Sequence, residues 1–337
     1  MQALEDNCAR LAQDLGLADR PEAIRAVEPL TGGVASDIAR VRIGDADYCM
    51  KFALPKLKVA ADWRAPVHRN AAEYAWLTVA AKIAPESAVR LYGRSETLHG
   101  FAMEFLAGQE VYLWKDALLQ GQAPKGEAAA VGGMLGRLHA ASAMADFDRS
   151  PFHNRDDFRA LRIEPYIEFT AGRHADLAAP LQALANSLYS AEIALVHGDV
   201  SPKNILFRTG GPVILDAECA TMGDPAFDVA FCLNHLVLKA LHLPACRAAY
   251  LQEAAALWAA YAPHVRWEPA AGLEARIAAL LPALMLARVD GKSPVEYLAP
   301  ETASQVRDLS KALILAPQAG LSALLSDISE QTKEQGA

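Results

Sequence analysis

Residues 197–204 read HGDVSPKN, the densest cluster of polar side chains in the chain, and residues 216–218, twelve residues after its end, read DAE. Each cluster directly follows an apolar run that is typical of a strand, so its carboxylate would lie at a strand end. A Thr-Gly-Gly-Pro turn at residues 209–212 joins the two strands between the clusters. The pattern therefore predicts that Asp199, Asn204 and Asp216 lie close together.

These three side chains offer two carboxylates and an amide oxygen. Such hard oxygen ligands are the ones that Mg²⁺ takes alongside substrate phosphates. The alternative is a solvated turn with chance acids, which is disfavoured because unpaired charge beside buried strands is costly. The cluster therefore predicts a magnesium site.

The rest of the chain divides into two parts that differ in composition and in the spacing of their apolar residues. With 53% apolar and 21% charged residues, the 337-residue chain has a globular composition. The first third predicts a small sheet with one helix, the helix following Pro66 and the strands near residues 38–43, 48–52, 89–92 and 100–105. After Gly108 the sequence turns rich in Ala and Leu at helical spacing. We therefore predict an α+β fold with a β-rich lobe at residues 1–106, a larger helical lobe at residues 107–337 and a frayed tail from Ser326.

The two polar clusters resemble a known family. H-G-D-x-x-x-x-N followed by an apolar residue and D-x-E looks like the catalytic loop and metal site of the aminoglycoside phosphotransferase/choline kinase family, and protein kinases use related elements. The likeness extends over roughly residues 25–300. It implies a bilobal protein kinase-like fold and a transferase that uses ATP or GTP with Mg²⁺ to phosphorylate a hydroxyl of a small molecule.

The resemblance also implies roles for individual residues. Asp199 would accept or orient the proton of the acceptor hydroxyl, while Asn204 and Asp216 would hold Mg²⁺. Glu218 could hold a second ion. Lys203 would meet the transferring phosphate, although an ordinary exposed loop lysine explains that residue equally well.

Residues 31–36, TGGVAS, lie between two predicted strands. Gly32 and Gly33 would let backbone N–H groups approach phosphate oxygens closely, and Ser36 could add a hydroxyl donor. A plain hairpin turn would have the same composition. The spacing matches neither a Walker A loop nor a dinucleotide-binding fingerprint.

Two further segments of the β-rich lobe are candidates for nucleotide binding. A lysine in mid-strand, such as Lys51, needs an anionic partner or a path to solvent. The resemblance gives it the α- and β-phosphates, with Glu73 as its ion-pair partner, although Glu73 could instead pair with Arg69 four residues earlier. The backbone from Glu104 to Leu106 would be the hinge that meets adenine, or simply an edge strand.

Several polar residues are expected to be structural. His197 should hold the loop by hydrogen bonds, Asp228 resembles the family's buried aspartate that caps the catalytic loop, and Asp224 suits the turn with Pro225. Residues 288–293, RVDGKS, break two apolar helices. Ser293 should cap a new helix in a capping box with Pro at N1, and a substrate contact by Arg288 or Asp290 is the alternative.

Two departures from protein kinases favour a small acceptor. Position 198 is glycine rather than arginine, and only eleven residues separate Asp216 from Asp228, with no A-P-E motif after them. That leaves little chain for a segment that docks a peptide.

Composition limits the partners and the location. A net charge of −8 argues against nucleic-acid binding and suits a cationic substrate, although total charge says little about one pocket. Five scattered cysteines and an acidic N-terminus without a secretory signal fit the cytoplasm, and the apolar run at residues 277–287 is too short for a membrane span. No pattern indicates an oligomeric state.

Two other functions fit parts of the pattern. A metal-dependent hydrolase could be built from five side chains, but it leaves the lysine, its glutamate and the glycine turn of the first lobe unused; the five are His197, Asp199, Asp216, Glu218 and Asp224. A non-catalytic nucleotide-binding protein is the second, and it is disfavoured because the parts that such proteins commonly lack are all present.

Overall fold

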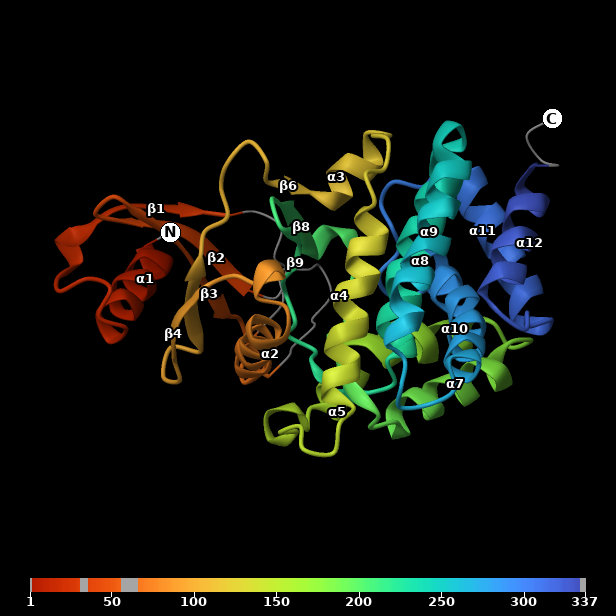
Figure 1. The fold of residues 1–337 in the computed structure, drawn as a ribbon, viewed down its shortest axis with the longest axis horizontal. Coiled ribbons are helices and arrows are strands. Elements are labelled where there is room, and N and C mark those ends of the chain that lie inside the picture. The colour runs from red at the N-terminus through yellow and green to blue at the C-terminus, as the bar shows by residue number, and fades with distance from the viewer. Residues whose placement is uncertain (1, 31–35, 56–65, 334–337) are drawn as a thin grey trace.

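The computed structural model describes residues 2–30, 36–55 and 66–333. Figure 1 shows a sheet at one end, built from the first third of the chain, and a larger assembly of helices at the other. The predicted division into a β-rich and a helical part is confirmed. The first part contains α1 (Gln2–Asp14), β1 (Ile24–Pro29), β2 (Ser36–Ile43), β3 (Ala46–Ala53), α2 (Arg69–Ile83), β4 (Leu91–Ser95) and β5 (Gly100–Glu104).

The five strands form one antiparallel sheet in the order β1-β2-β3-β5-β4. The predicted alternation of buried and outward-facing side chains in β2 is confirmed. Ala39 and Val41 are fully buried, whereas Arg40 and Arg42 lie on the other face. Both arginines pair with Asp47. No helix was predicted before the sheet. Yet α1 buries its apolar residues in a small separate core with this face of the sheet.

The helical part carries most of the core and three short strand pairs. Gly132 of α4 lies so close to Leu257 of α9 that an added Cβ would be 2.2 Å from the Leu257 carbonyl oxygen, which explains glycine there. The elements are β6 (Tyr112–Leu113), α3 (Trp114–Leu119), α4 (Glu127–Ser142), α5 (Arg155–Phe158), the π-helical η4 (Arg159–Glu168), α6 (Phe169–Arg173), α7 (Ala178–Ser190), β7 (Ala194–Val196), β8 (Ile205–Arg208), β9 (Gly211–Ile214), β10 (Thr221–Gly223), α8 (Ala226–His242), α9 (Arg247–Tyr261), α10 (Ala270–Asp290), α11 (Pro300–Leu315) and α12 (Leu321–Lys333).

Two details differ from the sequence predictions. The residues after Gly291 do not start a helix at Ser293, because α11 begins only at Pro300 with Ala299 as its N-cap. The tail does not fray from Ser326, because α12 continues to Lys333 and buries Ile328 completely. In both places tertiary packing outweighs the local signal.

Helix α10 is longer than the apolar run in the sequence suggested, because it continues through Pro282. By length and composition alone this 21-residue helix could cross a membrane, but 61% of its most apolar window is buried inside the protein. It packs between α8 and α11. That placement is typical of a core helix.

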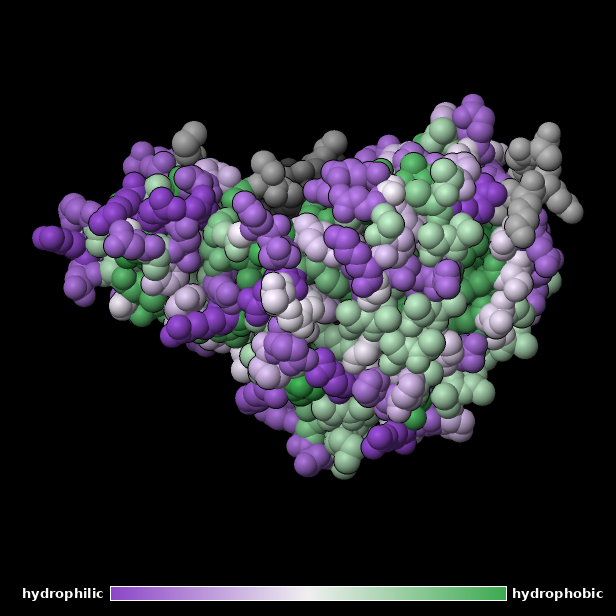
Figure 2. All heavy atoms as spheres, turned by 45° about the horizontal axis from the view of Figure 1, so that its top comes forward, coloured by the Kyte–Doolittle hydropathy of each residue, from purple (hydrophilic) through white to green (hydrophobic). Residues whose placement is uncertain are grey.

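Side chains join the two parts around the polar loops. The Trp76 ring of α2 meets His197 edge-on, with ring centroids 4.7 Å apart. On the opposite side, Arg208 of β8 donates to Glu104 at 3.1 Å and to the Ala88 carbonyl oxygen at 2.7 Å. On the face in Figure 2, hydrophilic residues cover most of the sheet end, and apolar residues are more frequent over the helical end. The site described next lies where the two parts meet.

Candidate functional site

A cavity of about 480 Å³ lies between the sheet and the helical part. Its apolar wall includes side chains from both parts, among them Leu30, Ile38, Met103, Leu206 and Leu215. Its polar wall is formed by Lys51, Glu73, Lys115, Asp116, Lys203, Asn204 and Asp216. The predicted hinge residues Glu104 and Leu106 line it as well. Residues from distant parts of the sequence therefore face one space.

Lys51 is the link between the sheet and the D-x-E segment. Its ammonium lies 2.7 Å from a Glu73 carboxylate oxygen and also contacts Asp216, and the side chains of Lys51 and Glu73 are almost completely buried. The Asp216 backbone N–H donates to Glu73 at 3.2 Å. Burial alone would lower the pKa of Lys51, but Asp216 and Glu73 outweigh burial and raise it. Lys51 is therefore a fixed cation at the cavity wall, and Glu73 pairs with it.

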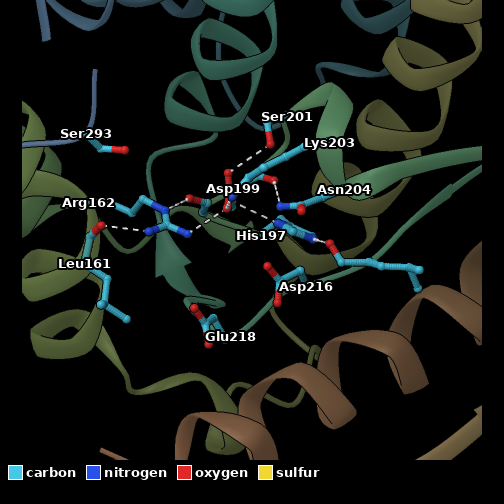
Figure 3. Close-up of polar contacts among 12 residues, drawn as sticks. Leu161, Arg162, His197, Asp199, Ser201, Lys203, Asn204, Asp216, Glu218 and Ser293 are labelled. Carbon is cyan, nitrogen blue, oxygen red and sulfur yellow. Dashed lines mark hydrogen bonds and ion pairs between the residues drawn. The ribbon is translucent and has the colours of Figure 1, made fainter. Parts of the chain in front are cut away.

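Asp199 is surrounded by donors on the HGD loop and on η4 (Figure 3). Its carboxylate lies 2.9 Å from the Arg162 guanidinium and 3.1 Å from the Lys203 ammonium, and it accepts a hydrogen bond from Ser201 at 3.1 Å. Burial would raise the pKa of Asp199, but Lys203 and Arg162 overcome burial and hold that pKa below its ordinary value. The carboxylate is therefore ionised at neutral pH.

His197 and Asp228 hold the loop in shape. The Asp228 carboxylate is fully buried and accepts backbone hydrogen bonds from His197 at 2.6 Å and Gly198 at 2.8 Å. The His197 ring accepts from the Asp199 N–H at Nδ1 and donates from Nε2 to the Leu215 carbonyl oxygen. Burial lowers the pKa of His197, so the ring stays neutral. The structural readings of both residues are confirmed.

Replacing Asp228 with alanine is expected to lower the free energy of unfolding by about 3–5 kcal/mol, because two loop N–H groups and His139, 3.3 Å from the carboxylate, lose their acceptor in the interior. Urea unfolding would measure the loss. The exposed Asp146 provides the control, since Asp146→Ala removes a carboxylate without burying any orphaned donor. An unchanged unfolding midpoint in Asp228→Ala would show that the capping bonds are unimportant.

Asn204 and Asp216 are the residues that the sequence predicts to hold Mg²⁺. Asn204 donates from its side-chain nitrogen to the Asp199 carbonyl oxygen at 3.1 Å, which leaves its amide oxygen free of that bond. Asp216 has a φ of 71°, a conformation rare for residues other than glycine and often found at functional sites. Asp216 and Asn204 both line the cavity. Glu218, in contrast, is 2.8 Å from Arg69, which already neutralises it.

The remaining predicted residues have mixed outcomes. Gly32 and Gly33 lie outside the described residues, and Ser36 begins β2 with a buried side chain. The segment at Glu104 is not an edge strand, because β5 pairs with β3 on one side and β4 on the other. The Glu104 side chain is held by Arg208.

Two arginines pair with carboxylates of this site to which the sequence did not connect them. Arg162 comes from the π-helical η4 and contacts Asp199, and Arg69 at the start of α2 contacts Glu218. Neither belongs to a motif. Their only trace is chemical: a buried carboxylate requires a cation nearby, but the sequence does not say which one.

The five side chains of the hydrolase alternative do not form one centre. Asp224 lies 2.8 Å from Arg276, Glu218 is held by Arg69, and both ring nitrogens of His197 are engaged. Within residues 2–30, 36–55 and 66–333, no group of three or more His, Cys, Asp or Glu side chains is arranged to hold a metal. Asp290, the alternative substrate contact in the sequence, forms an ion pair with Arg307 at 2.7 Å.

Comparison with known proteins gives both family and fold. The model of the phosphotransferase enzyme family matches residues 26–264. The chain is 23% identical over 274 residues to a methylthioribose kinase of Pectobacterium carotovorum, covering 71% of this chain and 66% of that one. A methylthioribose kinase of Cronobacter sakazakii is 24% identical over 259 residues, covering 68% and 64%. The chain thus spans just under two thirds of the length of these curated relatives.

Solved structures share the whole architecture. A choline/ethanolamine kinase family protein from Mesorhizobium loti superposes with a TM-score of 0.57 at 19% identity, covering 97% of this chain and 99% of the other. A choline kinase from Streptococcus pneumoniae gives a TM-score of 0.53 at 13% identity, covering 93% and 99%. At these identities the likeness establishes the fold.

Proposed function

Because the chain belongs to the phosphotransferase enzyme family, we propose that it transfers the γ-phosphoryl group of ATP to a hydroxyl of a small molecule. The observation that carries the proposal is the contact of Lys51 with both Glu73 and Asp216, which joins the sheet to the D-x-E segment at the wall of one cavity. Relatives named methylthioribose kinases support a small acceptor. Phosphoryl transfer depends mainly on positioning and charge neutralisation, and the site supplies both.

The nucleotide is proposed to bind with its adenine between the apolar walls, next to the backbone from Glu104 to Leu106. Its phosphates would reach Lys51, the fixed cation of the site. Gly32, Gly33 and Ser36 are proposed to bind the phosphates from the turn before β2. Solved neighbours of this fold include a kinase bound to AMP-PNP, with a TM-score of 0.52, which supports a nucleotide triphosphate as the donor.

Asn204 and Asp216 are proposed to hold Mg²⁺, because a cation that keeps several waters and two phosphate oxygens needs only one or two protein ligands. When bound, the ion supplies positive charge to the phosphates. Glu218 would reach a second ion only by leaving Arg69. It therefore ranks below Asp216 as a ligand.

Asp199 is proposed to orient the acceptor hydroxyl rather than to act as a strong base. A carboxylate with a lowered pKa takes up a proton poorly, but it accepts a hydrogen bond well. A loose transition state needs little help from a base. Lys203, which contacts Asp199 and lines the nucleotide cavity, is proposed to meet the transferring phosphate.

The proposal also covers partners and location. We expect a cytoplasmic protein that binds neither nucleic acid nor a membrane. Five free cysteines support a reducing compartment.

A screen of ATP consumption is expected to show ADP formation that depends on an added acceptor. The panel should include methylthioribose, choline, ethanolamine, amino sugars and aminoglycosides, with mass spectrometry to identify a phosphorylated product. Omitting Mg²⁺ is the control and should stop the reaction. Phosphate release without any acceptor would favour the hydrolase, and nucleotide binding without turnover would favour a non-catalytic role.

A further inference from the structure

A basic cluster of side chains lies where η4, α8 and α10 pack together. It starts at Tyr166 of η4, whose hydroxyl accepts from Arg288 at 3.2 Å. The Tyr166 ring meets Phe231 edge-on at 5.5 Å, and Phe231 meets His235 at 5.3 Å. One turn further along α8 stands Lys239, whose ammonium lies 5.0 Å from the ring centroid of Tyr297. We define this basic cluster as Tyr166, His235, Lys239, Arg288 and Tyr297.

The cluster adjoins the reacting end of the site. The charges of Asp199 and Lys203 both act on His235, and Lys115, which lines the nucleotide cavity, acts on Lys239. Lys115 is also 2.6 Å from Glu296, one residue before Tyr297. Ser293, which accepts from Arg288 at 2.9 Å, lies in Figure 3 beyond Arg162 and on the opposite side of Asp199 from Asp216. An acceptor whose hydroxyl faces Asp199 would extend into this cluster.

Lys239 carries the unsatisfied charge of the cluster. The residue is 1% exposed, and within the described residues no hydrogen bond or carboxylate contact to its ammonium is found. The carboxylate that acts on it, Glu296, is held by Lys115. Two polar atoms of the cluster, Arg288 Nε and the Tyr297 hydroxyl, are buried and have no hydrogen-bond partner within the described residues. Buried polar groups without partners are costly, so a ligand that satisfies them would be bound well.

The charges around the cluster indicate the sign of the charge that such a ligand would carry. Five basic side chains surround this end of the site; they are Lys115, Arg162, Lys203, Lys239 and Arg288. Four carboxylates act on them, namely Asp199, Asp216, Glu218 and Glu296. Each of the four is paired with a cation, and within the described residues none forms an ion pair with Lys239 or Arg288. Beside Lys239 and Arg288 the local charge is therefore positive. A cationic acceptor would meet repulsion here, although the net charge of the whole chain is −8.

On these grounds we propose that the acceptor of this enzyme carries an anionic group, a carboxylate or a phosphate, which binds to Lys239 and Arg288 while its hydroxyl faces Asp199. The inference rests on the proposed phosphotransferase function and narrows its acceptor class. Burial, together with Lys115 and Arg288, lowers the pKa of Lys239 to about 7. An anion beside Lys239 would raise that pKa again.

Calorimetry on the protein loaded with Mg²⁺ and a non-hydrolysable ATP analogue tests the inference, because the analogue fills the γ-phosphate position. Gluconate and glucose 6-phosphate are the anionic probes, glucose is the neutral probe and glucosamine the cationic one. At least one anionic probe should bind more tightly than glucose and glucosamine. At pH 8, binding of the anionic probe should be accompanied by the uptake of as much as one proton. Repeating the titration in buffers of different ionisation enthalpy would detect this uptake.

Variants of Lys239 identify the residue responsible. Lys239→Met should weaken the anionic probe about 10- to 100-fold and abolish the proton uptake, whereas Lys239→Arg should keep most of the affinity. Lys239→Met removes a buried amine that has no carboxylate partner within the described residues, so the variant should fold. Lys311→Met, which removes a surface ammonium paired with Asp176, is the matched control and should change nothing.

Two results would overturn the inference: tighter binding of glucosamine than of both anions, or anion affinities that are equal in the native protein and in Lys239→Met. Turnover separates this failure from failure of the proposed function. Phosphorylation of glucosamine or choline, with no use of anionic acceptors, leaves phosphoryl transfer standing and refutes only the acceptor class. ATP binding with no phosphorylation of any acceptor refutes both.

Discussion

Asp199→Asn is expected to lower the rate of phosphoryl transfer by about 10²–10⁴-fold while ATP binding changes little. The residue is 3% exposed, and its carboxylate lies between Arg162, Lys203 and Ser201. Asparagine has the same shape, but its amide lacks the negative charge that orients a hydroxyl proton. Calorimetry for ATP and initial rates with a saturating acceptor would separate binding from turnover.

The control for this variant is Asp146→Asn, a change of the same size at an exposed position. It should leave both the rate and the ATP affinity unchanged. If Asp199→Asn turned over at the native rate, Asp199 would not be the residue that orients the acceptor. If it lost ATP binding instead, the carboxylate would act mainly by holding Arg162 and Lys203 in place.

Asp216→Asn should remove most of the dependence of nucleotide affinity on Mg²⁺. We expect the affinity for ATP with Mg²⁺ to fall at least about 100-fold, since the loss of outer-shell partners alone weakens metal sites 10- to 100-fold. Asparagine is the right substitution because it tolerates the φ of 71° at this position, which alanine does not. Calorimetry with Mg²⁺ and with EDTA gives the two affinities to be compared.

Glu218→Gln is the comparison for that experiment, because Glu218 is two residues away but paired with Arg69 at 2.8 Å. A smaller loss in Glu218→Gln than in Asp216→Asn would agree with the ranking of the two carboxylates. An equal loss would mean that Glu218 leaves Arg69 to bind an ion. Native Mg²⁺ dependence in Asp216→Asn would place the cation elsewhere.

Local sequence was enough to predict the core of this site. The strand ends before Asp199 and Asp216 and the tight turn between β8 and β9 constrain short stretches of chain, so the two loops could be placed side by side from their spacing alone. The pairing of Lys51 with Glu73 came from the family resemblance, and the structure has that contact. The amphipathic alternation of β2 was equally readable, because its period is local.

The site residues that the sequence did not predict were those without a local sequence signature. Arg162 reaches Asp199 across 37 positions of the sequence and Arg69 reaches Glu218 across 149, so no spacing rule connects either pair. The helix start was misplaced at Ser293 for a related reason. A capping box stabilises a helix by only about 1 kcal/mol, which the packing of α11 and the contacts of Arg288 with Ser293 outweigh.

The sequence by itself determined which polar groups this protein has for chemistry, namely the acids and the amide of the two loops and the mid-strand lysine. It also determined that one lobe is rich in β-strands and the other is helical. Only the tertiary structure decided how those groups are charged and what surrounds them. Asp199 is kept ionised by Lys203 and by Arg162 from η4, and Lys239 is buried with no carboxylate partner among the described residues. The physical reason is that hydrogen-bonding patterns and periodicity act along the chain, whereas burial and Coulomb interactions act through space.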